Sequence, residues 1–170
     1  ALPPFLRDNS CQAVVLGEGD PPYAEALQQL AADMPGRFAF IPAHSESIAR
    51  LIFAGSDAFL VPSLYEPCGL TQMYALRYGS VPIVRDTGGL RDTVTHFDPH
   101  SGIGTGSVFR DADTGGLSWA ISQALAWYQQ PSAWQQLRHN GMQADFSWAH
   151  QTPHYLALYR RLAGLQPQAS

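Results

Sequence analysis

A carboxylate, a thiol and a glycine lie close together in the segment Glu66–Gly69, here called the Glu66 turn. Gly69, Leu70 and Thr71 would present backbone N–H groups at a helix start, where a glycine lets a phosphate approach the backbone. Thr71 adds a hydroxyl. The alternatives are an ordinary glycine-initiated helix and, for Glu66, a solvated loop carboxylate, since charged side chains are mostly exposed.

A second glycine turn follows in Thr87–Gly89, here called the Gly88 turn. Gly88 and Gly89 leave the same two interpretations open, an anion-facing turn or a plain helix start. The two turns together therefore predict one ligand site only if the fold brings them to the same place.

The strands and helices around the two turns are predicted to bring them to the same edge of a sheet. The run 59–61 is apolar without alternation, as in a strand of a parallel sheet that is buried on both faces, and Pro62 ends it. A helix begins near Gly69, with Leu70, Met73 and Tyr74 at helical spacing on one face. The run 81–84 is a second buried strand. Both turns then lie at the carboxyl ends of adjacent strands, where open α/β sheets bind ligands.

The rest of the chain alternates between strand and helix in the same way. This alternation predicts an α/β fold, a doubly wound and mostly parallel sheet in one domain over residues 1–170, with a helical C-terminal segment. Residues 1–10 are expected to be irregular. The expected strands are 12–16, 38–41 and 108–109, and the expected helices are 24–33, 48–54 (capped by Ser45 or Ser47), 114–128, 132–143 (capped by Ser132) and a last one from Pro153 to Leu162.

Composition limits the possible partners. The chain has 170 residues, 45% of them hydrophobic, enough for one substantial core. A net charge of −4 argues against nucleic acid and anionic membranes as partners, and no apolar run is long enough for a membrane span. The two cysteines suit a reducing compartment better than a disulfide scaffold.

Histidine spacing predicts no metal site and no cofactor. His150 and His154 are four residues apart, but Pro153 is expected to interrupt the helix that would align them. His96 and His100 lie in a loop with Asp98. No Ser–His–Asp arrangement can be argued from the sequence.

Three segments together resemble a known family. They are PSLYEPCGLTQMYALRYGSVPIVRDTGGLRDTV, the later DFSW at 145–148 and LYRRL at 158–162. In that order and spacing they resemble the donor-site signature of bacterial glycogen synthases and plant starch synthases, which are retaining glycosyltransferases of the two-lobed GT-B architecture. The resemblance implies that this chain is the Rossmann-like C-terminal lobe, cut on its N-terminal side.

The resemblance also implies residue roles. The residue that matches Glu66 contacts the hydroxyls of the donor sugar, and the Gly88 turn lies beside the glucose. His44 stands in the loop that presents a ring to the nucleobase, or it is a surface histidine. Tyr74 stands where some related families carry a second Glu. The implied nucleotide-sugar-binding positions are His44, Cys68, Gly69, Leu70, Thr71, Gly88 and Gly89.

The implied reaction is transfer of glucose from ADP-glucose, or from UDP-glucose, to an α-1,4-glucan with retention and without a metal or cofactor. The glucan acceptor would bind through the N-terminal lobe, and the chain alone is not expected to catalyse transfer. The compartment would be the cytoplasm in a bacterium or the plastid stroma in a plant. The alternatives are another retaining GT-B enzyme, such as a sucrose synthase type, and a non-catalytic module that binds nucleotide or glucan.

Overall fold

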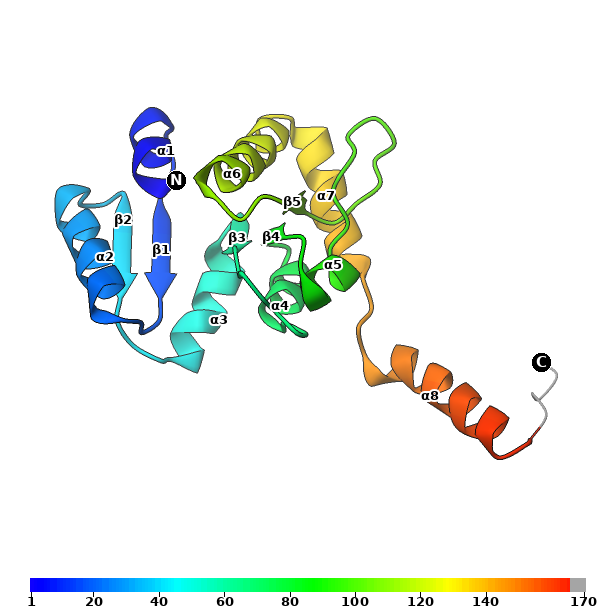
Figure 1. Cartoon of the computed structure of the whole chain (residues 1–170). Coiled ribbons are helices and arrows are strands. Elements are labelled where there is room, and N and C mark those ends of the chain that lie inside the picture. The colour runs from blue at the N-terminus through cyan, green and yellow to red at the C-terminus, as the bar shows by residue number, and fades with distance from the viewer. Residues whose placement is uncertain (166–170) are drawn as a thin grey trace.

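The computed structural model describes residues 1–165, in which helices alternate with short strands (Figure 1). The strands are β1 (Ala13–Leu16), β2 (Phe38–Ile41), β3 (Ala58–Val61), β4 (Val81–Arg85) and β5 (Ser107–Phe109). The helices are α1 (Leu2–Asp8), α2 (Pro21–Asp33), α3 (Glu46–Gly55), α4 (Thr71–Tyr78), α5 (Gly88–Thr93), α6 (Thr114–Tyr128), α7 (Pro131–Gln143) and α8 (Trp148–Leu162).

All the strand pairs named here are parallel, which confirms the predicted α/β class. Their hydrogen bonds form two sheets rather than one: β1 pairs with β2, and β3–β4–β5 form a second sheet. In Figure 1 the strands run in the order β2, β1, β3, β4, β5, so β1 is the strand of the smaller sheet that faces β3.

The hydrophobic core surrounds β4, whose first four residues are all buried. On one side Val81 and Ile83 pack with residues of α6 and α7, including Trp127 and Leu137. On the other side Val84 packs with a second cluster from β3, α4 and α5. The apolar run without alternation therefore marked a strand that is covered on both faces.

Helix α1 was not expected, and α2 and α7 begin earlier in the sequence than predicted, each of the three with proline in the first turn. Residues 2–8 form α1, in which Pro3 and Pro4 lie in the first turn, where the missing proline N–H would have no partner in any case. Similarly, α7 begins at Pro131 with Gln130 as its N-cap, not at Ser132.

The prediction that Pro153 precedes the last helix is wrong. Helix α8 begins at Trp148, capped by Ser147, whose hydroxyl accepts from the N–H of His150 at 3.4 Å, and Pro153 lies inside the helix. His150 and His154 therefore do come together, with ring centroids 6.1 Å apart. Across residues 1–165, however, no group of three or more His, Cys, Asp or Glu side chains could hold a metal ion.

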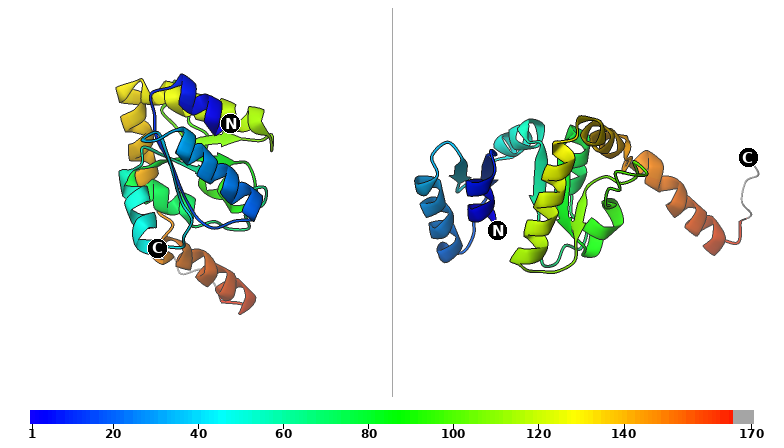
Figure 2. Two further views of the ribbon diagram at one scale, coloured as in Figure 1. Left: turned by 90° about the vertical axis from the view of Figure 1, so that its left-hand side faces the viewer. Right: turned by 90° about the horizontal axis from the view of Figure 1, so that it is seen from above.

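Helix α8 extends away from the rest of the protein and buries none of its residues (Figures 1 and 2). Of the helices within residues 1–165, none has the length and apolar character needed to span a bilayer.

Candidate functional site

The two glycine turns lie at one edge of the larger sheet. Val61, the last residue of β3, is in register with Val84 of the parallel strand β4. The segments that follow these strands, which contain the Glu66 turn and the Gly88 turn, therefore leave the sheet at the same edge. This juxtaposition was predicted from the two buried strands.

The two turns touch through their backbones. The N–H of Gly89 donates to the carbonyl oxygen of Glu66 at 3.0 Å. A methyl group on Gly88 would lie 1.9 Å from that same oxygen, and one on Gly89 would lie 2.0 Å from the carbonyl oxygen of Cys68. Gly88 also has a φ of +44°, which favours glycine. Only glycine at both positions allows the turns to approach this closely.

The residues that lead into the Glu66 turn are hydrogen-bonded to the last residue of β4. Arg85 donates through Nη1 to the carbonyl oxygens of Ser63, at 3.3 Å, and of Leu64. The hydroxyl of Ser63 in turn donates to Oε2 of Glu66 at 3.4 Å. Glu66 is half-buried rather than fully solvated. Its side chain is thus connected to the sheet, which a freely solvated loop carboxylate would not be.

The N-terminus of α4 is open. Its N-cap, Leu70, makes no side-chain capping bond, and Gly69 before it has a φ of +71°. Thr71 is exposed at the first helical position. The first backbone N–H groups of a helix have no partner within it and carry its positive dipole end, so this terminus can accept an anion. At α5, by contrast, the N–H of Gly89 is already occupied by Glu66.

Helix α4 buries a polar residue together with two apolar ones. Its buried residues are Gln72, Ala75 and Leu76, whereas Leu70 is 54% and Tyr74 49% exposed. The sequence interpretation identified a face with Leu70, Met73 and Tyr74 but did not predict the fully buried glutamine, because burial of a polar side chain depends on partners distant in sequence.

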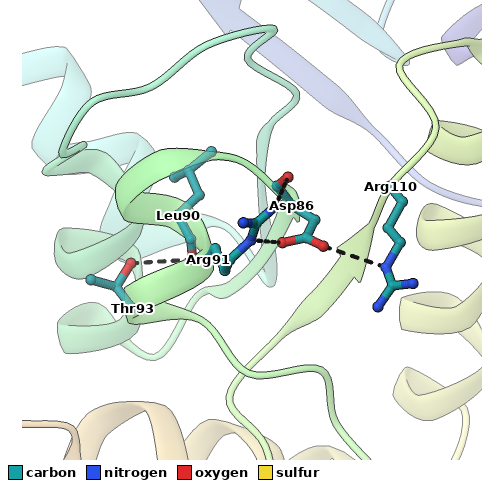
Figure 3. Close-up of polar contacts among 5 residues, drawn as sticks. All are labelled: Asp86, Leu90, Arg91, Thr93 and Arg110. Carbon is teal, nitrogen blue, oxygen red and sulfur yellow. Dashed lines mark hydrogen bonds and ion pairs between the residues drawn. The ribbon is translucent and has the colours of Figure 1, made fainter.

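Beside the Gly88 turn lies an open depression lined by Asp86, Arg91 and Arg110 (Figure 3). Arg91 Nε donates to Asp86 Oδ1 at 2.5 Å, and Arg110 Nε lies 3.4 Å from Oδ2. The hydrogen bond from Arg91, helped by the positive charge of Arg110, holds the pKa of the Asp86 carboxyl below its ordinary value. The depression is thus lined by two guanidinium groups and one carboxylate, and the neighbouring carboxylate of Asp92 also acts on Arg91.

The remaining two predicted site residues are both exposed. His44 lies in the loop after β2, with Nε2 3.8 Å from Oε2 of Glu18 in the loop after β1. It belongs to the edge of the smaller sheet. Cys68 lies in the Glu66 turn, with Sγ 3.6 Å from the carbonyl oxygen of Gly69.

Known proteins resemble this chain along most of its length. Glycogen synthase of Syntrophotalea carbinolica is 47% identical over 162 residues, which is 94% of this chain and 33% of that protein. Glycogen synthase of Geobacillus stearothermophilus is 44% identical over 157 residues, 92% of this chain and 32% of that protein. The chain thus spans about a third of the length of these relatives.

A solved starch synthase structure also resembles this chain. The catalytic domain of starch synthase IV from Arabidopsis thaliana, bound to ADP and acarbose, superposes with a TM-score of 0.78 at 34% identity, over 88% of this chain and 32% of that chain. The Rossmann-like α/β fold of a GT-B lobe, expected from the sequence, is therefore confirmed. The family model for glycosyl transferases group 1 matches residues 2–140, and the chain belongs to that family.

Proposed function

We propose that this chain is the donor-binding lobe of a glycogen or starch synthase. The full-length protein would transfer glucose from ADP-glucose, or from UDP-glucose, to the end of an α-1,4-glucan with retention. The observation that carries the proposal is the open N-terminus of α4 directly after the Glu66 turn. The ADP in the starch synthase IV structure supports a nucleotide diphosphate as ligand.

The proposed chemistry divides between the N-terminus of α4 and the side chain of Glu66. The distal phosphate of the donor binds the N–H groups of Gly69, Leu70 and Thr71, where the helix dipole stabilises negative charge on the departing diphosphate. Glu66 faces the sugar and stabilises the positive charge that develops at the anomeric carbon as its bond to phosphate oxygen breaks. Neither role needs a metal ion.

The remaining residues have supporting roles in the proposal. Gly88, exposed at the start of α5, borders the glucose, and His44 offers its exposed ring to the nucleobase. Arg91 and Arg110, which line the depression beside the Gly88 turn, supply guanidinium groups that attract an anionic donor. Leu64 and Tyr65, 75% and 76% exposed before Glu66, suit a site that an acceptor lobe covers.

The bacterial relatives favour the cytoplasm as the compartment.

ADP is expected to protect Cys68 from alkylation. Iodoacetamide should modify exposed Cys68 faster than half-buried Cys11. ADP bound at the α4 N-terminus would cover the Cys68 sulfur and slow its reaction, leaving the reaction of Cys11 unchanged. Peptide mapping after timed treatment, with and without saturating ADP, measures both sites, and calorimetry with ADP, UDP and maltooligosaccharides measures binding. Equal labelling of Cys68 in both samples, with ADP bound, would place the nucleotide elsewhere.

We also propose that a further strand joins the two sheets into one domain. Gly17 donates its N–H group to Ile41 of β2, Ala13 donates to Arg37 directly before β2, and the carbonyl oxygen of Asp57 accepts from Val81 of β4. Because alternate residues of a strand direct their backbone groups to opposite edges, residues 14 and 16 of β1 and 58 and 60 of β3 face the gap between the sheets. Val14 is 38% exposed although it is apolar. A parallel strand from the rest of the full-length protein would pair with both edges.

Amide hydrogen exchange tests the strand. In the full-length protein the N–H groups of Val14, Leu16, Ala58 and Leu60 should exchange at least about tenfold more slowly than in the 170-residue chain, since new ladder bonds protect them. The N–H of Val15, already directed at β2, serves as the control. Equal rates for the four amides in both proteins would rule out a strand in the gap.

A further inference from the structure

Gln72 is a polar side chain with no exposed surface, in the first turn of α4. Its Nε2 lies 3.2 Å from the carbonyl oxygen of Cys68, 3.0 Å from that of Gly69 and 3.0 Å from Oγ1 of Thr93. Cys68 and Gly69 belong to the Glu66 turn, whereas Thr93 is the last residue of α5. One amide group therefore contacts both helices that begin at the candidate site.

The Thr93 hydroxyl determines which group donates in its hydrogen bond with Gln72. Oγ1 donates its hydrogen to the carbonyl oxygen of Gly89 at 2.6 Å, so it can only accept from Gln72. The same hydroxyl lies 3.4 Å from the carbonyl oxygen of Leu90, pointing back along α5 as Figure 3 shows. A chain of hydrogen bonds thus runs from the Glu66 turn through Gln72 and Thr93 to Gly89.

A separate bond closes this chain into a ring. The N–H of Gly89 donates to the carbonyl oxygen of Glu66 at 3.0 Å. The Glu66 turn and the start of α5 are therefore connected twice, once by main chain alone and once through two side chains. With two connections, neither turn can rotate or slide against the other without breaking a bond.

The atoms of Gln72 indicate that its donor group matters most. Its Oε1 is buried and has no hydrogen-bond partner within residues 1–165, which costs free energy. An apolar side chain of similar shape would avoid that cost but would leave two carbonyl oxygens without a donor. A glutamate would place negative charge against them. The amide suits a position that must hold carbonyl oxygens in place.

We propose that Gln72 and Thr93 are positioning residues that fix the Glu66 turn and the Gly88 turn in a single arrangement. Gln72 is fully buried and cannot touch a ligand, and Thr93, which is half-buried at the end of α5, acts through it. Their bonds set the separation between Glu66, the open N–H groups of α4 and the start of α5. This inference rests on the proposed donor site for its consequence in binding, but not for the connection itself.

Replacing Thr93 tests the connection in the 170-residue chain. Thr93→Val keeps the shape and removes the hydroxyl, whereas Thr93→Ser keeps the hydroxyl. Thr93→Val removes both the bond from Gln72 and the bond to Gly89. We expect it to shift the ¹⁵N–¹H resonances of Cys68 and Gly69, in the other turn, and to weaken ADP binding about fivefold, the size of about one net hydrogen bond. Thr93→Ser should restore both to nearly wild-type values.

A matched control separates positioning from general loss of stability. Ser107 is fully buried, and its hydroxyl donates to the carbonyl oxygen of Ala120 at 3.0 Å, in the core on the far side of β4. Ser107→Ala removes a comparable bond and should leave the Cys68 and Gly69 resonances and the ADP affinity unchanged. Gln72→Met, which removes the donor from the other end, should reproduce the effect of Thr93→Val and serves in its place should that variant not fold.

The outcomes are distinct. Resonances of Cys68 and Gly69 that stay in place in Thr93→Val, or move equally in Ser107→Ala, would overturn the connection. If Thr93→Val shifted the resonances of Cys68 and Gly69 but left the ADP affinity unchanged, the proposed role of Gln72 and Thr93 in nucleotide binding would be wrong. A wild-type chain that binds no ADP would count against the proposed function, and the resonances alone would then decide whether the two turns are coupled.

Discussion

Replacing Gly89 with alanine is expected to destabilise the protein, although alanine is the better helix former. Inside a helix alanine is favoured over glycine by about 1 kcal/mol. At this position, however, the new methyl group would lie 2.0 Å from the Cys68 carbonyl oxygen, in a residue that is buried. The contact is with backbone, which cannot rotate away. Overpacking costs about 1–3 kcal/mol, and a clash of 2.0 Å with backbone belongs at the upper end, so after the helix gain we expect a net loss of about 2 kcal/mol.

Urea denaturation of both proteins measures the loss, and Gly55→Ala provides the control. Gly55 is the last residue of α3, and a methyl group there would meet no atom within 4 Å. Gly55→Ala should therefore leave stability unchanged or slightly raised. Gly89→Ala should in addition abolish ADP binding, because relief of the clash moves the Glu66 turn. A Gly89→Ala protein as stable as the wild type would show that the two turns can separate without cost.

The sequence predicted the elements of the site correctly where the signal is local. The apolar run of β4 lacks alternation because both faces are covered, and this is visible in the residue types themselves. In β3 only Val61 is buried, and Phe59 and Leu60 are partly buried, each packed against a different core cluster. The turns after these two strands follow from Pro62 and from the glycines. Parallel pairing then places both turns at one edge, as the register of Val61 with Val84 confirms.

What the sequence did not predict depends on main-chain atoms and distant partners. The bond from the Gly89 N–H to the Glu66 carbonyl involves no side chain, so no residue type signals it. Gln72 in the first turn of a helix suggests a solvated side chain, and only Thr93, 21 positions later, shows why it is buried. The division into two sheets likewise depends on strand pairing, which periodicity does not reveal.

Proline was the other source of error. Residues 1–10 were expected to be irregular and Pro153 was expected to interrupt a helix, yet Pro3, Pro4 and Pro153 each lie within a helix. Pro3 and Pro4 are tolerated because they lie in the first turn of α1, where a backbone N–H would have no partner within the helix. For Pro153 the signal was Ser147, an N-cap residue six positions earlier whose hydroxyl fixes the true start of α8.

Replacing Glu66 with glutamine in the full-length protein is expected to remove most glucose transfer while nucleotide affinity stays nearly unchanged. The substitution changes charge and almost nothing else. The glutamine oxygen can still accept the bond from Ser63, which is 3.4 Å long in the structure. The bond from Gly89 goes to the main-chain oxygen of residue 66 and is unaffected. The arrangement of the two turns should therefore persist.

The expected size of the effect follows from the proposed role. A charged group that stabilises the transition state but not the bound nucleotide lowers kcat by about 100- to 1,000-fold when it is removed, with little change in ground-state binding. Steady-state transfer of labelled glucose to glycogen measures kcat, and calorimetry with ADP measures affinity. Glu46→Gln, at an exposed carboxylate that pairs with Arg50 on α3, controls for the loss of one negative charge. If both variants retained full turnover, Glu66 would be a structural carboxylate whose side chain only anchors Ser63. A loss of ADP affinity in Glu66→Gln equal to the loss of turnover would instead assign the carboxylate to arranging the phosphate-binding turn.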